Sequence, residues 1–250
     1  MNFELYFLLV ASLLFLISLF FSINFKKEKI GESMIFPAIF VQFLLLVVRS
    51  WSAKHPPFTN MYETMILLPF LFSLRLVLWK KQLEGNTRFG VIFLVLLLNM
   101  IAILVPGPMK EIRPLMPALN SPWMYIHVPS YFVAYSSMLM AAILAVMTLI
   151  RKDDLVLMKK LDEEVKIAFF FLNLGMITGA IWAYFSWGTY WGWDTKETWS
   201  LINILVLSYY FHVRKSETVS KAAIVIFTLL TIIFTYVGVT FILPGLHSYT

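Results

Sequence analysis

The sequence of 250 residues contains no cysteine and little charge. Without a thiol, the chain cannot form a disulfide, bind a metal through sulfur or carry out thiol exchange. Charged residues make up 14% of the chain, whereas a soluble domain carries roughly 25%. Hydrophobic residues make up 60%, and the mean hydropathy is +0.80. This composition excludes a soluble enzyme, a disordered chain and a disulfide scaffold.

The hydrophobic residues are concentrated in runs about as long as a membrane-spanning helix, which needs roughly 20 residues. The sequence predicts eight such spans, near residues 4–24, 33–50, 62–79, 89–106, 127–150, 167–186, 196–213 and 222–243. The expected fold class is therefore all-α, a polytopic integral membrane helix bundle. Because no internal repeat or domain linker is evident, residues 1–250 are expected to form a single membrane domain.

Lysine and arginine are unevenly distributed between the two sets of loops. Most of the 20 lie in the predicted loops 25–32, 80–88, 151–166 and 214–221. The positive-inside rule places these loops on the cytoplasmic side, or its organellar equivalent, and both termini on the outer side. The net charge of +6 is thus explained by the lysines and arginines that orient the chain in the membrane. With no compact basic patch interleaved with aromatic residues, no nucleic-acid partner is expected.

Residues 182–199, predicted to form a loop on the outer face, hold five of the eight tryptophans. One or two tryptophans at a membrane interface commonly serve as anchors. The density here is too high for anchoring alone, and Gly188 and Gly192 relieve crowding of the backbone. The segment is therefore expected to form a broad planar surface that fits a flat aromatic ligand.

Two pairs of residues have the spacing of a helix cap. Asp194 and Glu197 precede and open the seventh predicted span, and Asn60 and Glu63 do the same for the third. In such a capping pair, the first side chain accepts a backbone hydrogen bond from the helix and the second reaches back toward the cap. The acidic residues of the tryptophan-rich segment thus have a structural explanation beside a functional one.

The four histidines divide between the two faces. His55, His127 and His247 lie on the predicted outer side, whereas His212 lies at the inner end of the seventh span. Each alone is explained by hydrogen bonding at a helix end. Together, His127 and His247 can face the tryptophan-rich segment, an arrangement that suggests two axial ligands of a haem. His212 lies roughly 20 Å from Trp199 along a helix, at 1.5 Å per residue, and marks a second position.

Residues 187–199 read Trp-Gly-Thr-Tyr-Trp-Gly-Trp-Asp-Thr-Lys-Glu-Thr-Trp. They resemble the "WWD" signature of haem-handling proteins in cytochrome c maturation. The end of this motif resembles the CcsA (ResC) branch of system II, whereas the CcmC loop continues toward Ala-Arg-Leu-Thr. Residues 54–63, 127–128 and 245–249 also resemble CcsA segments, in the family's order. Thr195 departs from the pattern, since the family usually has proline there.

The resemblance implies a haem site on each side of the membrane. His127 and His247 would be the axial ligands of a non-covalent haem b on the outer face. The residues of the WWD motif that would hold this haem are Trp187, Trp191, Trp193, Asp194 and Trp199. His212 would belong to an inner haem site that is shared with a partner protein of the CcsB (ResB) type. His55 is not expected to contact haem.

The family presents haem to an apocytochrome c, whose Cys-x-x-Cys-His thiols add across the haem vinyl groups. The chain would thus be one component of a cytochrome c haem lyase or synthase, in a bacterial cytoplasmic or plastid thylakoid membrane. No residue is expected to act as a catalytic acid or base, because positioning the reactants supplies much of the barrier reduction.

Three alternatives stay open at the level of sequence. The chain could deliver haem to a soluble chaperone, as CcmC-like proteins do. It could be a small-solute transporter, although such proteins often show repeated halves and broken helices, which are not evident here. A structural subunit of a respiratory complex would retain no haem when isolated.

Overall fold

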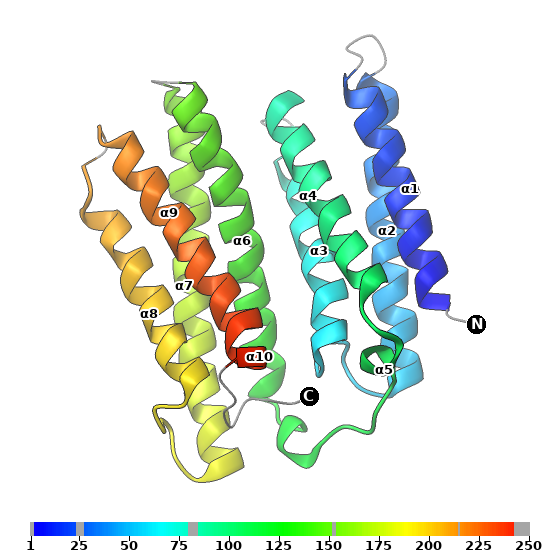
Figure 1. Cartoon of the computed structure of the whole chain (residues 1–250), viewed down its shortest axis with the longest axis vertical. Helices are drawn as coiled ribbons and strands as arrows, with labels where there is room; N and C mark the ends of the chain where they lie inside the picture. Colours follow the sequence, from blue (N-terminus) through cyan, green and yellow to red (C-terminus); the bar gives the residue numbers. More distant parts are fainter. Residues whose placement is uncertain (1–2, 24–27, 80–84, 152–153, 215, 243–250) are drawn as a thin grey trace. The chain divides into compact units, whose positions relative to one another are not determined.

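The computed structural model describes residues 3–23, 28–79, 85–151, 154–214 and 216–242. Within these ranges the chain is built from helices and contains no strand. Its internal contacts divide it into two compact units, Met1–Leu115 and Met116–Thr250. We call them the N-terminal and C-terminal units and describe each by itself (Figure 1).

The N-terminal unit consists of four long helices and one short helix. These are α1 (Phe3–Ile23), α2 (Glu28–Ala53), α3 (Met61–Leu78), α4 (Gly85–Leu104) and α5 (Gly107–Lys110). Helix α1 packs against α2 and α4, and α3 packs against α2 and α4. The long helices alternate in direction, so that α5 lies near the end of the unit where α2 runs into α3 (Figure 1).

A buried hydrogen-bonded cluster joins all four long helices of this unit. Gln42 Nε2 donates to Asn99 Oδ1 at 3.0 Å, and Ser73 Oγ donates to Gln42 Oε1 at 2.9 Å. Asn99 Nδ2 in turn donates to Ser12 Oγ at 3.3 Å. Because buried polar groups must find partners in an apolar interior, the cluster fixes how the four helices face one another.

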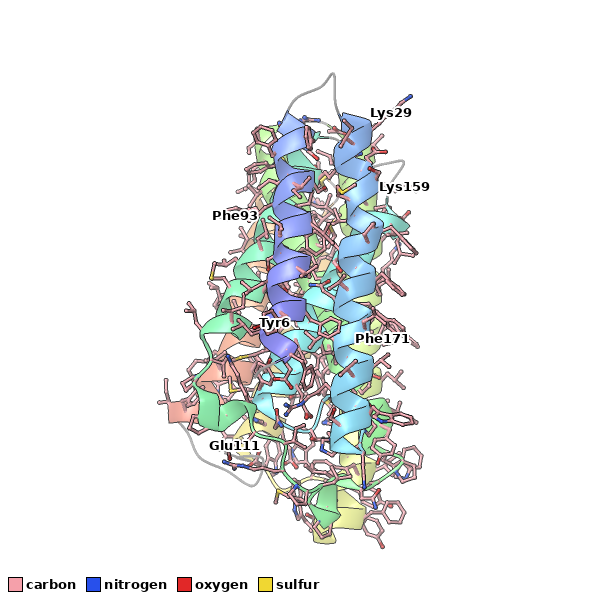
Figure 2. All side chains as sticks on the ribbon, turned by 90° about the vertical axis from the view of Figure 1, so that its right-hand side faces the viewer. Tyr6, Lys29, Phe93, Glu111, Lys159 and Phe171 are labelled. Atoms are coloured by element: carbon pink, nitrogen blue, oxygen red, sulfur yellow. The ribbon has the colours of Figure 1, made fainter. Side chains whose placement is uncertain are left out.

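A second buried cluster surrounds Arg49 near the end of α2. Its guanidinium forms ion pairs with Glu4 at 2.6 Å and Glu63 at 3.1 Å, and it donates to the Lys110 carbonyl at 2.8 Å. In Figure 2, which looks onto α1 and α2, Glu111 marks this end of the unit and Lys29 the opposite end. The cluster holds the start of α1, the end of α2, the start of α3 and the end of α5 together.

The C-terminal unit contains α6 (Met124–Ile150), α7 (Leu155–Trp187), α8 (Thr195–Tyr209) and α9 (Thr218–Ile233). Each helix packs against the next, and α9 packs back against α6, which closes a four-helix arrangement. After α9, a π-helical turn (Phe234–Gly238) leads into the short helix α10 (Val239–Ile242). The start of α6, the α7–α8 loop and α10 lie at one end of this unit (Figure 1).

The prediction of a polytopic membrane helix bundle is confirmed. Among the described residues, seven helices are long and apolar enough to cross a membrane. The eighth predicted span, residues 196–213, corresponds to α8, which has 15 residues and is followed by a 3₁₀ turn over Tyr210–His212. At 1.5 Å per residue α8 is only about 22 Å long, shorter than a hydrocarbon core of about 30 Å.

The predicted inner loop 151–166 is wrong over most of its length. Helix α7 already begins at Leu155, because the Asp154 side chain caps it by accepting from the backbone N–H groups of Val156 and Leu157 at 3.0 Å. The prediction of one membrane domain remains a prediction.

Candidate functional site

His127 lies in the first turn of α6, four residues after the N-cap Trp123. Its ring Nδ1 lies 2.8 Å from the carbonyl oxygen of Gly175 on α7. Its ring stacks on the indole of Trp182, with centroids 5.8 Å apart and planes 20° apart. The ring also meets Tyr131, one turn further along α6, edge to face at 5.1 Å. The orientation of the imidazole is therefore fixed by contacts with both helices.

Two glycines on α7 leave the space that His127 and Tyr131 occupy. A Cβ atom on Gly179 would overlap the His127 ring, 2.5 Å from Nδ1, and a Cβ atom on Gly175 would lie 2.8 Å from the Tyr131 ring. Real Cβ atoms do not approach that closely. Both positions must lack a side chain for α6 and α7 to pack as they do.

Trp182 connects α7 to the segment that precedes α6. Its side chain is 1% exposed, and its Nε1 donates to the Ala118 carbonyl at 2.8 Å. Trp187, at the end of α7, meets Trp182 at 4.8 Å between centroids. An open hollow of about 660 Å³ is lined by Ala118, by other residues of the segment before α6, and by Phe185 and Ser186 of α7. The aromatic segment is thus anchored to the start of α6 as well as to α7.

The tryptophan rings do not form the broad planar surface expected from the sequence. Trp182 and Trp187 are inclined at 66°, and Trp191 and Trp193 at 89°. Edge-to-face packing of this kind is favoured by the charge distribution of aromatic rings. Residues 188–194 lie between α7 and α8. The expectation of one flat wall is therefore wrong for these two pairs.

The predicted cap of α8 is confirmed. Asp194 Oδ1 accepts from the Lys196 backbone N–H at 2.9 Å, and Glu197 Oε2 accepts from the Asp194 N–H at 3.0 Å. Glu197 Oε2 also accepts from the Gly192 N–H at 2.8 Å. Thr195 is the first residue of α8, at a position where the resembled family usually has proline. The first position of a helix is also the one that tolerates proline best. Threonine there keeps the turn intact.

Trp193 lies between the two peptide N–H groups that Glu197 binds. Its φ of 57° is in the left-handed region, which bulky residues rarely adopt. Its side chain is 70% exposed. Unusual backbone conformations of this kind tend to occur at functional sites, where the surrounding structure enforces them. The capping carboxylate therefore holds Trp193 with its ring presented at the surface.

Trp199 and His212 lie toward opposite ends of α8. Trp199 packs against Phe234 of the π-helical turn, with centroids 4.4 Å apart. His212 is exposed at the end of the 3₁₀ turn that follows α8. This agrees with the expectation that His212 does not share a site with the tryptophan-rich segment.

The remaining two histidines are His55 and His247. His55 is buried in the N-terminal unit, with its ring nitrogens near the carbonyl oxygens of Pro56 at 3.1 Å and Arg113 at 3.4 Å. His247 lies outside the described residues. Its role as the second axial ligand remains a prediction.

Sequence reasoning missed the roles of Gly175 and Gly179 in this site. A signal was present, because both pairs, His127 with Tyr131 and Gly175 with Gly179, are four residues apart. Residues at this spacing lie on one face of a helix. Only the packing of α6 against α7 shows that the two pairs meet.

Residues 1–247 match the family model described as cytochrome C assembly protein. The chain is 32% identical over 247 residues to the cytochrome c biogenesis protein CcsA of Chlamydomonas reinhardtii, covering 91% of this chain and 70% of that one. It is 29% identical to CcsA of Mesostigma viride, covering 97% and 93%. It is 28% identical to CcsA of Prochlorococcus marinus (strain MIT 9303), covering 82% and 79%.

The fold is similar to a solved structure titled cytochrome c haem lyase CcmF. The two superpose with a TM-score of 0.71 at 17% sequence identity, over 92% of this chain and 45% of that one. At this identity the likeness concerns the fold. The chain thus spans less than half of the length of that protein.

Proposed function

Because this chain belongs to the cytochrome C assembly protein family, and within it to the CcsA proteins, we propose that it handles haem b for covalent attachment to an apocytochrome c. The observation that carries the proposal is the environment of His127, whose ring is oriented by a carbonyl and an indole beside the tryptophan-rich loop. The family relatives favour this function over a small-solute transporter.

The residues around His127 fit an axial ligand of haem iron. A hydrogen bond from Nδ1–H to a carbonyl favours the tautomer whose lone pair is on Nε2, the nitrogen that would bind iron. Haem ligation requires such an imidazole within apolar, aromatic surroundings. The stacked ring of Trp182 and the edge of Tyr131 supply these surroundings.

Each predicted site residue has a role in this proposal. His127 and His247 would hold the outer haem iron, and His212 would belong to an inner site shared with a membrane partner of the CcsB (ResB) type. Trp187, Trp191, Trp193 and Trp199 would hold the porphyrin, while Asp194 shapes the loop through its cap. Because the Trp182–Trp187 and Trp191–Trp193 pairs are inclined, their rings would face a ligand from more than one direction.

The chain contributes orientation to the reaction. The haem supplies the vinyl groups when bound, and the thiols belong to the Cys-x-x-Cys-His segment of the apocytochrome, since this chain has no cysteine. Holding both reactants in register lowers the barrier without an acid or base from the enzyme. The reaction takes place on the outer side of a bacterial cytoplasmic or plastid thylakoid membrane.

The test is an absorption spectrum of the protein purified with its partner co-expressed. Reduced-minus-oxidised spectra are recorded for the wild type and for His127→Ala, His247→Ala and the matched control His55→Ala. We expect acid-extractable haem with two nitrogen ligands in the wild type and in His55→Ala, and an altered or lost spectrum in the other two variants. A partnered wild type without haem, or spectra unaffected by both substitutions, would contradict the proposed site.

A further inference from the structure

We propose that α7 contains the positioning residues of His127, with Gly179 setting the plane of its ring and the Gly175 carbonyl and Thr178 hydroxyl setting its strength as a ligand. This inference rests on the proposed function, in which His127 binds haem iron. It assigns a role to three residues of α7 outside the WWD motif.

The first step is steric. The His127 ring lies where a side chain on residue 179 would project, and a methyl group there would overlap the ring. The ring is also stacked within 20° of the Trp182 indole plane. Rotating the ring to relieve an overlap would break this stacking. Glycine at position 179 is therefore required for the present orientation of the imidazole.

The second step is the close approach of the two helices one turn away. Gly175 lies against the face of Tyr131, so that α6 and α7 come near enough for the Gly175 carbonyl to reach His127 Nδ1 at 2.8 Å. A carbonyl oxygen has two lone pairs and accepts this bond in addition to one from its own helix. The backbone of α7 thus serves as the outer-shell partner that orients a ligating histidine.

The third step concerns a weaker, additional donor to the same carbonyl. The buried Thr178 hydroxyl has one proton, which it donates mainly to the Leu174 oxygen at 2.7 Å and only weakly to the Gly175 oxygen at 3.2 Å. Donors that share the Gly175 oxygen compete for its electron density. Without the Thr178 hydroxyl, the bond from His127 Nδ1–H strengthens, which makes the imidazole a stronger donor to iron. A stronger donor stabilises the ferric state and lowers the reduction potential.

The experiment uses the full chain with its partner and compares four variants. Gly179→Ala tests the ring orientation, and Thr178→Val tests the competing hydrogen bond with little change in volume. Gly107→Ala is a neutral control, because no atom lies within 4 Å of its added Cβ. Gly31→Ala is a packing control, because its Cβ would lie 2.8 Å from the Ser18 carbonyl oxygen, far in sequence from His127. The readouts are haem content, absorption spectrum, midpoint potential and response to added imidazole.

We expect Gly179→Ala to lose the wild-type spectrum and to regain two nitrogen ligands when imidazole is added. We expect Thr178→Val to keep its haem and its spectrum type but to show a lower midpoint potential. Gly107→Ala is expected to match the wild type. Gly31→Ala is expected to accumulate less protein, with an unchanged spectrum and potential in the protein that folds.

The proposal is overturned if Gly179→Ala has the wild-type spectrum, or if Thr178→Val keeps the wild-type potential. Should Gly179→Ala fail to accumulate, the potential of Thr178→Val decides alone. If His127→Ala also leaves the spectrum unchanged, the proposed haem site itself is wrong. If His127→Ala alters the spectrum and the α7 variants do not, only the inference about α7 fails.

Discussion

Replacing Arg49 with methionine is expected to destabilise the N-terminal unit strongly. The Arg49 side chain is 1% exposed and lies between two carboxylates, Glu4 at 2.6 Å and Glu63 at 3.1 Å. Methionine keeps an apolar chain of similar reach but leaves both carboxylates buried without their cation. Removing one partner of a buried ion pair costs about 3–5 kcal/mol, and the Lys110 carbonyl loses a donor worth roughly 1 kcal/mol.

The assay is equilibrium unfolding of the purified protein in mixed micelles, with increasing SDS as denaturant and helix content followed by circular dichroism. We expect the free energy of unfolding to fall by about 5 kcal/mol in Arg49→Met. Arg113→Met removes an exposed cation from the same unit and is expected to change it by less than about 0.5 kcal/mol. The triple variant with Glu4→Gln and Glu63→Gln should recover most of the loss.

Two results would refute this reasoning. If Arg49→Met lowers the free energy of unfolding by less than about 1 kcal/mol, the Arg49 ion pairs contribute no more than exposed ion pairs do. Burial of the charges would then not determine how much the cluster stabilises the unit. If the triple variant is no more stable than the single one, the cost comes from lost packing and not from uncompensated charge. In either case haem binding is a separate readout, because the Arg49 cluster contains no predicted haem ligand.

Three further variants test other parts of the structure. Trp193→Gly removes the strain of a tryptophan in the left-handed region and should raise the free energy of unfolding by under about 1 kcal/mol. The thermal midpoint should rise slightly with it, while the haem content per protein falls. Glu197→Ala removes the acceptor on both sides of Trp193, so helix stability should fall by about 1 kcal/mol, and haem content should fall with it. Asn99→Leu leaves the buried Gln42 amide without its acceptor and should cost about 1–3 kcal/mol in the same unfolding assay, with an unchanged haem spectrum.

The helices were predictable because an apolar run of fixed length has few alternatives to a membrane span. Their ends were less so. Hydropathy alone predicts a late start for α7, since the charges after Leu155 resemble a loop, whereas the Asp154 cap sets the start at Leu155. The apolar run 196–213 is longer than α8, because its last residues form a 3₁₀ turn over Tyr210–His212 that hydropathy does not distinguish from α-helix. Hydropathy therefore identifies the apolar run that crosses a membrane better than it identifies the first and last residues of the helix.

The geometry of the candidate site could be predicted only in part. Histidine and tryptophan at the predicted outer face suggest a haem ligand set, which stays a prediction. The contact of His127 with Gly175 depends on how α6 and α7 pack, which the spacing within each helix does not determine. The relative tilt of the tryptophan rings is likewise set by pairwise packing, so a count of aromatic residues could not predict it.

The structural and functional explanations of the acidic residues in the tryptophan-rich motif were alternatives at the level of sequence. In the structure, the Glu197 carboxylate that completes the cap of α8 accepts from the N–H groups of Gly192 and Asp194. These two groups flank Trp193, so the bonds that start the helix also fix a backbone conformation that tryptophan disfavours. One carboxylate therefore both caps the helix and fixes the backbone of Trp193, so a capping role is no argument against a role in binding.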